Sequence, residues 1–400
     1  MMSAMATTDD GHRRLSAVRR DGEQVTALEL FFDLVFVLAV TQCTAIVVED
    51  PSLEGVARGL LVLGVIWWSW VGYAWLTSVV DPEEGAVRLA MFAAMAAFLV
   101  MALCVPDAFD DLGLTFAIAY AAVRAAHIAL FVLASRDDPS LRTSVIGLAV
   151  STTLGVGVLA AAHWTDGTTQ GVIWAVAVLL DVAGPFLFGS EGWKLVPAHF
   201  AERHGLVLII ALGESVVAIG VGAEAGVDAG VVLAAVLGIV LLAALWWAYF
   251  DVVAILAGRA LSAAEHGRVQ NEMARDAYSF IHFPMVAGIV LIAFALESTI
   301  AHPGDPLSSV AAWALVGGAA LFLLANVGFR LRTFGGLSVQ RLVPAAALLA
   351  LFPAARELPA SATVALVATM LWLLVVYESS RWSEARDRIR HGPAEGPSPA

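Results

Sequence analysis

Residues 27–47 read ALELFFDLVFVLAVTQCTAIV, and this stretch decides the fold class. It is long and apolar enough to cross the hydrocarbon core of a bilayer, which takes about 20 residues of α-helix. Similar stretches recur along the 400-residue chain, which is 60% hydrophobic and only 14% charged. They do not alternate between polar and apolar residues as the strands of a membrane barrel do. We therefore predict an all-α integral membrane protein, because helices satisfy their own backbone groups in lipid.

Hydropathy predicts about 12 transmembrane helices with both termini in the cytoplasm. With this count, most of the 22 lysine and arginine residues fall on the side of the N-terminus, as the positive-inside rule requires. Residues 1–26 and 381–400 are then cytoplasmic tails, and the composition of the second tail predicts disorder. The predicted spans are 27–47, 55–77, 86–105, 112–134, 143–162, 169–188, 202–222, 228–257, 276–299, 308–329, 339–355 and 360–380.

The two halves of the chain share a pattern that predicts an internal duplication. A glutamate opens the first and the seventh span, a polar pair follows about twelve residues later, and a tryptophan pair occupies the next span: Glu29, Thr41-Gln42 and 67–68, against Glu202, Glu214-Ser215 and 246–247. We predict two six-helix membrane repeats, 27–199 and 200–380. Because six is even, the repeats would be parallel and related by an axis along the membrane normal, near spans one and seven or their neighbours.

Polar and ionisable side chains inside the spans are the candidate functional residues. Each costs about 3 kcal/mol in the bilayer centre unless it is paired or hydrated, so each is a functional hypothesis by default. The acidic excess among the deeper groups favours a cation or proton path over an anion path. The candidates are Glu29, Asp33, Gln42, Arg124, His127, Asp181, Glu214, Asp251 and His282.

Three of these candidates are acids in the first and seventh spans. Glu29 and Asp33 are four residues apart and share one helix face, which indicates either a cation or proton site or structural carboxylates near a helix N-terminus. Glu214 lies close to the predicted midplane and is either a proton or cation carrier or the partner of a buried base. Gln42 belongs to the neutral pair that corresponds to it in the first half.

Arg124 is the one arginine in the middle of a predicted span, and a buried arginine needs an anion. The expected partner is Asp33, Asp181 or Glu214, in a structural ion pair or in one that breaks during transport. His127 shares the face of Arg124.

The remaining candidates carry weaker signals. Asp181 precedes Gly184-Pro185, which can interrupt a helix and free carbonyl groups for a polar cavity. Asp251 lies near the cytoplasmic end of the eighth span. His282 is either a satisfied core residue or a ligand, and His204, beside Glu202 and Arg203, is expected to be solvated.

Several chemistries have no motif in this sequence. There is no phosphate-binding loop, dinucleotide fingerprint or zinc-protease motif, and no nucleophile elbow. The two cysteines have no metal-binding spacing, and the net charge of −13 does not favour nucleic acid. We expect no enzyme activity, no cofactor and no metal. The expected partners are membrane lipids and a proton or small cation.

Three segments, ELFFDLVFVLAVTQ (29–42), ERHGLVLIIALGESVVAIG (202–220) and HFPMVAGIV (282–290), resemble the bacterial low temperature requirement A (LtrA) family. The resemblance covers about residues 25–380. It implies a multi-pass protein of the bacterial inner membrane that is linked to growth in the cold. It implies no defined biochemical activity.

The leading prediction is a proton- or cation-linked permease or channel-like transporter that uses Glu214 and Asp33, with Arg124 as their counter-ion. One alternative is a non-transporting membrane protein that supports the envelope in the cold. Another is an intramembrane lipid-modifying enzyme that uses Asp181 and His127. A water-filled cavity at Glu214 would favour transport. A dry core in which every polar group is paired would favour the non-transporting protein, and a lateral opening to lipid would favour the enzyme.

Overall fold

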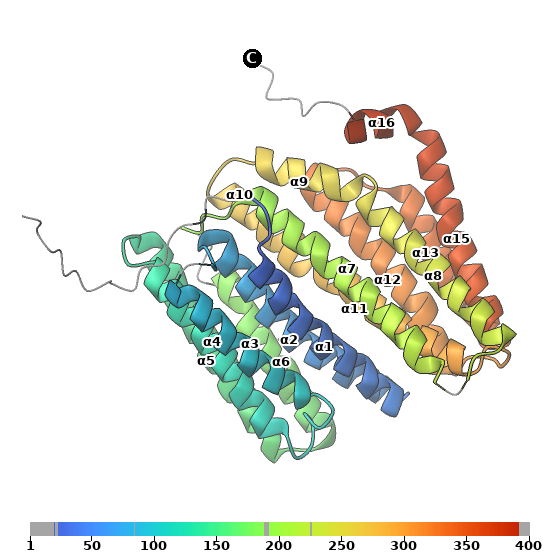
Figure 1. The fold of residues 1–400 in the computed structure, drawn as a ribbon, viewed down its shortest axis with the longest axis horizontal. Coiled ribbons are helices and arrows are strands. Elements are labelled where there is room, and N and C mark those ends of the chain that lie inside the picture. Colours follow the sequence, from blue (N-terminus) through green and yellow to red (C-terminus); the bar gives the residue numbers. More distant parts are fainter. Residues whose placement is uncertain (1–19, 21–22, 84, 188–191, 225, 392–400) are drawn as a thin grey trace, which may run out of the picture.

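The computed structural model describes residues 20, 23–83, 85–187, 192–224 and 226–391. Within these residues the fold is helical and contains no β-strand (Figure 1). The helices are α1 (Ala27–Glu49), α2 (Leu53–Val79), α3 (Gly85–Leu103), α4 (Gly113–Ala134), α5 (Pro139–Ala161), α6 (Gly167–Leu187), α7 (Pro197–Gly222), α8 (Ala229–Phe250), α9 (Val253–Ala263), α10 (Arg268–Met273), α11 (His282–Ala301), α12 (Ser309–Phe334), α13 (Val339–Ala350), α14 (Phe352–Ala355), α15 (Ala360–Arg381) and α16 (Ser383–His391). A 3-10 turn, Ala162–Trp164, follows α5, and a π-helical turn, Ala274–Phe280, joins α10 to α11.

Ten helical segments of the described chain are long and apolar enough to cross a membrane. Two shorter apolar helices, Val87–Leu103 and Val339–Ala350, correspond to the third and eleventh predicted spans. The helical membrane class is therefore confirmed. The count of twelve spans, the parallel repeats and the cytoplasmic termini stay predictions.

The structure divides two of the predicted spans. The span predicted at 228–257 ends at Phe250 and resumes at Val253, because the backbone leaves helical geometry at Val252 (φ −137°, ψ −39°). The span predicted at 339–355 is split between α13 and α14, and Pro353 lies in the first turn of α14, where its missing N–H costs nothing. Residues 383–391 of the tail predicted to be disordered form α16, whereas 392–400 lie outside the described residues.

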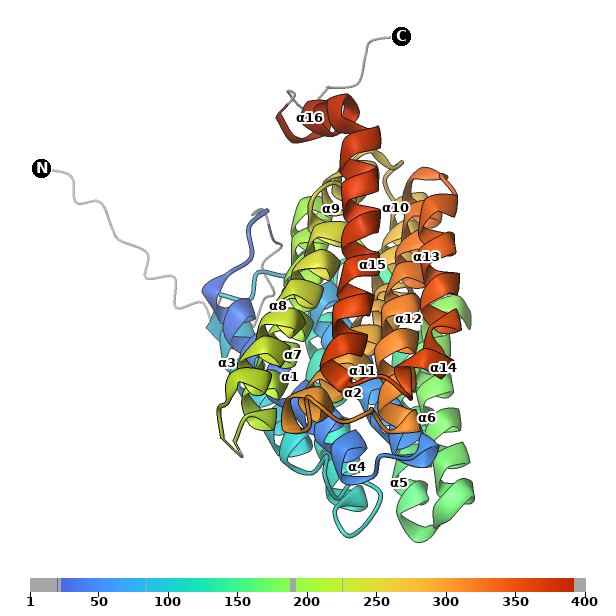
Figure 2. The same cartoon turned by 90° about the vertical axis from the view of Figure 1, so that its right-hand side faces the viewer.

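The helices form two flanks around a shared centre (Figure 1). Helices α3–α6 make one flank, and α8, α12, α13 and α15 make the other, which faces the viewer in Figure 2. Between them α1 packs against α2, α7 and α11, and α2 also contacts α4, α6 and α7. Most of α2 is buried, including Trp67, Trp68, Trp70 and Trp75. The tryptophans of α2 are therefore packing residues at the centre of the bundle and do not form an interfacial belt.

The outer faces of the flanking helices carry many exposed leucine, valine and isoleucine side chains, such as Leu179 on α6 and Leu233 on α8. An apolar exterior of this extent suits contact with lipid rather than water. The polar side chains inside the bundle are therefore enclosed by a protein core and by the bilayer beyond it, so their contacts decide the functional site.

Candidate functional site

Three buried carboxyl groups lie along the contact between α1 and α7. Glu29 and Asp33 are on α1, Glu214 is on α7, and each is at most 1% exposed. Their partners across the contact are His199 and Arg203 on α7 and Thr41 on α1. We call these six residues the polar seam.

Glu29 is at the end of the polar seam where α1 begins. The backbone N–H of Thr26, the N-cap residue, donates to its Oε2 at 2.8 Å, which completes a capping box. The guanidinium of Arg20 donates to the same oxygen at 3.2 Å. The other oxygen lies 2.8 Å from His199 Nε2, and His199 Nδ1 lies 2.8 Å from the hydroxyl of Ser78 on α2. Glu29 is therefore paired with a titratable group that has a further hydrogen-bond partner behind it.

Asp33 lies one helical turn further along α1. Its Oδ1 accepts a hydrogen bond from the indole N–H of Trp70 at 2.9 Å and lies 3.0 Å from Arg203 Nη2. Its other oxygen, Oδ2, and the Nε and Nη1 atoms of Arg203 have no hydrogen-bond partner among the described residues. An unpaired polar atom in a buried site costs about 1–3 kcal/mol, which a bridging water can offset. This pair therefore has unused hydrogen-bonding capacity inside the bundle.

Glu214 lies about 16 Å further along α7 than Arg203, given a rise of about 1.5 Å per residue. The hydroxyl of Thr41 donates to its Oε2. No basic side chain of the described chain forms an ion pair with it. Gln42, the other member of the polar pair on α1, forms no hydrogen bond with Glu214 within the described residues. Glu214 is therefore held by a hydroxyl group rather than by a base.

Arg124 pairs with Asp181 and with neither Asp33 nor Glu214. Its Nη2 lies 2.9 Å from Asp181 Oδ1 and 2.7 Å from the hydroxyl of Thr152, which in turn donates to Asp181 at 2.6 Å. The Tyr120 hydroxyl donates to the second oxygen of Asp181. The prediction that Arg124 is the counter-ion of Glu214 and Asp33 is therefore wrong. The reason is that α4 and α6 both pack against α5, whereas the acids of α1 pair with His199 and Arg203 of α7.

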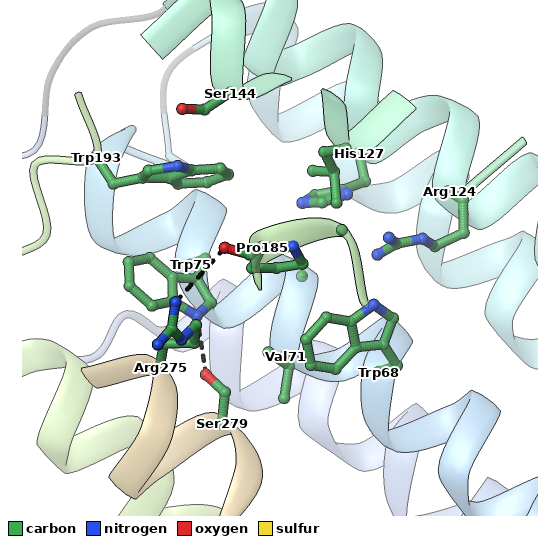
Figure 3. A pocket seen from close by; sticks show the side chains of 13 residues that line it. Trp68, Val71, Trp75, Arg124, His127, Ser144, Pro185, Trp193, Arg275 and Ser279 are labelled. Atoms are coloured by element: carbon green, nitrogen blue, oxygen red, sulfur yellow. Dashed lines mark hydrogen bonds between the residues drawn. The ribbon is translucent and has the colours of Figure 1, made fainter. Parts of the chain in front are cut away.

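A cavity of about 50 Å³ lies beside this cluster (Figure 3). A water needs about 10–15 Å³ of such space, so the cavity has room for a few waters. His127 lines it, and neither of its ring nitrogens has a hydrogen-bond partner among the described residues. The predicted break at Gly184-Pro185 does not occur, because α6 continues to Leu187, but both residues line the cavity. The other lining residues are Trp68, Val71, Gly72, Trp75, Arg124, Ser144, Leu148, Trp193, Arg275 and Ser279.

A larger apolar groove of about 460 Å³ lies between α2, α6 and the start of α11. Leu60, Trp67, Val178 and Phe283 are among the residues that line it. It shares Trp68 and Ser279 with the smaller cavity, so the two hollows are neighbours.

A histidine and tyrosine cluster adjoins the polar seam. His204, which follows Arg203, is fully buried, so the expectation that it is solvated is wrong. Its ring stands 5.4 Å from that of His282, measured between centroids. His282 Nε2 lies 2.9 Å from the Tyr249 hydroxyl, and its Nδ1 lies 3.0 Å from the carbonyl of Ala277 in the π-helical turn. Such turns occur frequently at functional sites.

Asp251 lies away from this cluster, at the end of the bundle. It pairs with Arg386 and Arg390 of α16. No group of three histidine, cysteine or acidic residues in the described chain is placed to hold a metal ion.

Sequence reasoning missed the two bases of the polar seam. His199 and Arg203 are four residues apart on α7, the same spacing as Glu29 and Asp33 on α1. Two helices with acid and base pairs at equal spacing can align both pairs at once. This matched spacing was the signal available in the sequence.

Comparison with known proteins identifies the family of this chain. The family model of the bacterial low temperature requirement A protein (LtrA) matches residues 24–376. The chain belongs to the LtrA family. Two of the LtrA-like segments, 29–42 and 202–220, are the parts of α1 and α7 that carry most of the polar seam. The protein is therefore a multi-pass LtrA-family membrane protein with acid–base pairs between two of its helices.

An uncharacterised protein of Rhizobium meliloti (strain 1021) is 30% identical over 374 residues, which cover 89% of this chain and 90% of that relative. No solved structure matches this LtrA-family chain.

Proposed function

We propose that this LtrA-family protein is a proton-linked permease of the bacterial inner membrane and that the polar seam carries the proton. The observation that supports this most strongly is the set of three buried carboxyl groups between α1 and α7. Ionisable groups at such depth are rare in membrane helices and mark ion or proton paths. The proposed partners are membrane lipids and the proton, together with a solute whose identity the seam does not specify.

The contacts at the end of the polar seam where α1 begins suit proton exchange. His199 lies between a hydroxyl, Ser78, and a carboxylate, Glu29, both at 2.8 Å. A histidine in this position can receive a proton on one nitrogen and release one from the other. Asp33 and Arg203 lie one turn deeper and leave three polar atoms free for ordered water.

Glu214 has the position of a carrier group. It is deep, it has no ion-pair partner among the described residues, and Thr41 is its hydrogen-bonded neighbour. A carboxyl without a counter-ion can change its protonation without breaking a salt bridge. By contrast, Asp181 is engaged by Arg124, Thr152 and Tyr120, which suits a structural lock between α4, α5 and α6.

Proton uptake by proteoliposomes tests the proposal. A potassium diffusion potential drives protons inward, and a pH-sensitive dye inside the vesicles reports them, with and without a panel of added solutes. We expect Glu214→Gln to lower the protein-dependent rate at least tenfold. Glu224→Gln is the matched control, because Glu224 is exposed just after the end of α7. Equal rates for the wild type and Glu214→Gln would contradict the role of Glu214.

A second candidate function, a lipid-modifying enzyme, is favoured by the apolar groove that adjoins the cavity of His127. The acid that such an enzyme would use, Asp181, is already occupied by three neighbours, so it is poorly placed as a general base. We therefore propose a transporter rather than an enzyme. A link to growth in the cold, as the family description suggests, is part of this proposal and can be tested by deleting the gene and measuring growth at low temperature.

A further inference from the structure

A second cavity, of about 230 Å³, lies at the end of the bundle that α16 covers. It is formed by α8, α9, α12, α13, α15 and α16, far along the chain from the acids of α1. Charged groups line it, namely Asp251, Arg330, Arg341, Glu378 and Arg386. Two tryptophans, Trp247 and Trp382, also line it. We call it the arginine cavity.

Both carboxylates of the arginine cavity are already neutralised. Arg341 donates from Nε and Nη2 to the two oxygens of Glu378 at 2.8 and 2.7 Å, and from Nη1 to the carbonyl of Ala248 at 3.0 Å. Asp251 accepts from Arg386 Nη2 at 2.8 Å and from Arg390 Nη1 at 2.6 Å. One acid holding two arginines leaves the cavity with an excess of positive charge.

Arg330 supplies the rest of this excess. Its guanidinium makes no hydrogen bond or ion pair within the described chain, and its Nε is buried. Its guanidinium carbon lies 5.4 Å from the centroid of the Phe334 ring. Removing a cation from water is unfavourable unless an anion lies beside it. The two carboxylates of the cavity are paired with other arginines, so Arg330 can face a further anion.

Depth and size indicate which anion fits. Arg330 lies four residues before the end of α12, about 6 Å along the helix axis, which is headgroup depth in a bilayer. The volume of about 230 Å³ exceeds the ~10–15 Å³ that one water needs and falls below the ~300–1,000 Å³ of drug-sized pockets. It suits a single oxyanionic group, and guanidinium groups bind phosphate oxygens well.

We propose that the arginine cavity binds a phosphate group, with Arg330 as its main contact. In the bilayer this phosphate belongs to the headgroup of an anionic lipid, since basic pockets between helix ends are known to take such headgroups. The acyl chains then lie along the outer faces of α12 and α15. The bound phosphate joins α12 to α16 through Arg330 and Arg386.

Native mass spectrometry of the purified full chain tests this site, with phosphatidylglycerol or phosphatidylethanolamine added to the detergent solution. We expect the wild type to retain phosphatidylglycerol at least tenfold more tightly than phosphatidylethanolamine. Arg330→Gln should remove most of this preference. Arg332→Gln is the matched control and should keep it, because Arg332 is partly exposed and already pairs with Asp276 at 3.0 Å.

Further measurements separate the outcomes. Arg330→Lys retains the charge and should keep part of the preference, so it covers the case in which Arg330→Gln does not fold. Displacement of the lipid by millimolar inorganic phosphate would assign the site to free phosphate, and retention of the lipid would assign it to the headgroup. Equal binding of the two lipids by the wild type, or the same preference in Arg330→Gln, would overturn the proposal.

Discussion

At the scale of single residues, the stability of the protein should be sensitive to mutation of the buried pair Asp33 and Arg203. Both side chains are almost fully buried, and the distance between Asp33 Oδ1 and Arg203 Nη2 is 3.0 Å. Removing one partner of a buried ion pair costs about 3–5 kcal/mol, because the other charge stays behind without compensation. Removing both charges leaves no such unpaired group.

We expect Arg203→Gln and Asp33→Asn each to lower the free energy of unfolding by about 3–5 kcal/mol. The double variant should be less destabilised than the sum of the two, by at least about 1 kcal/mol. Unfolding in detergent micelles with increasing denaturant measures this. Arg58→Gln is the control and should change stability by less than about 1 kcal/mol, because its pair with Glu54 is exposed. Strict additivity would show that the two side chains do not interact.

At the scale of helices, close backbone approach holds α11 against α12. A Cβ atom added at Gly318 of α12 would lie 2.6 Å from the carbonyl oxygen of Gly288 on α11, which is backbone and has little freedom to move. The neighbouring Gly317 has only a ring atom of Trp313 within reach, at 3.8 Å. Small residues at such crossings let membrane helices pack without a hydrophobic driving force.

These neighbouring glycines give a matched test of helix packing. Gly318→Ala should destabilise the protein by about 1–3 kcal/mol, as overpacking does elsewhere. Gly317→Ala should be neutral or stabilising by up to about 1 kcal/mol, because alanine has the higher helix propensity. Thermal unfolding of the two variants in the same detergent distinguishes them. A similar change in both would mean that the α11–α12 approach does not limit stability.

At the scale of the whole molecule, the orientation of the helices is the property to test. Both cysteines, Cys43 and Cys104, are buried and leave a silent background for labelling. Single cysteines at Asp111, Glu265 and Glu357 would report three exposed positions. The topology with twelve spans places Asp111 and Glu357 outside the cell. We therefore expect an impermeant maleimide to label Asp111→Cys and Glu357→Cys in intact cells. Glu265→Cys should react only after the membrane is opened.

Labelling of Glu357→Cys from the inside would show that α13 and α14 do not cross the membrane. Labelling of Asp111→Cys from the inside would show that α3 does not cross it. These are the two helices too short for an unambiguous span by length alone, so the experiment decides the count where the sequence is weakest.

The sequence by itself determined the helical membrane class, the positions of the long spans and the family, because each depends on local hydropathy or on contiguous motifs. It also singled out Glu29, Asp33 and Glu214 as candidate functional acids, whereas their burial is seen only in the tertiary structure. Only the tertiary structure decided their partners. It placed His199 and Arg203 against α1 and gave Asp181 to Arg124. Which acid pairs with which base depends on which helices are neighbours. Many helices have similar faces of leucine, valine and alanine, so in lipid their neighbours are decided by shape and polar contacts over the whole bundle.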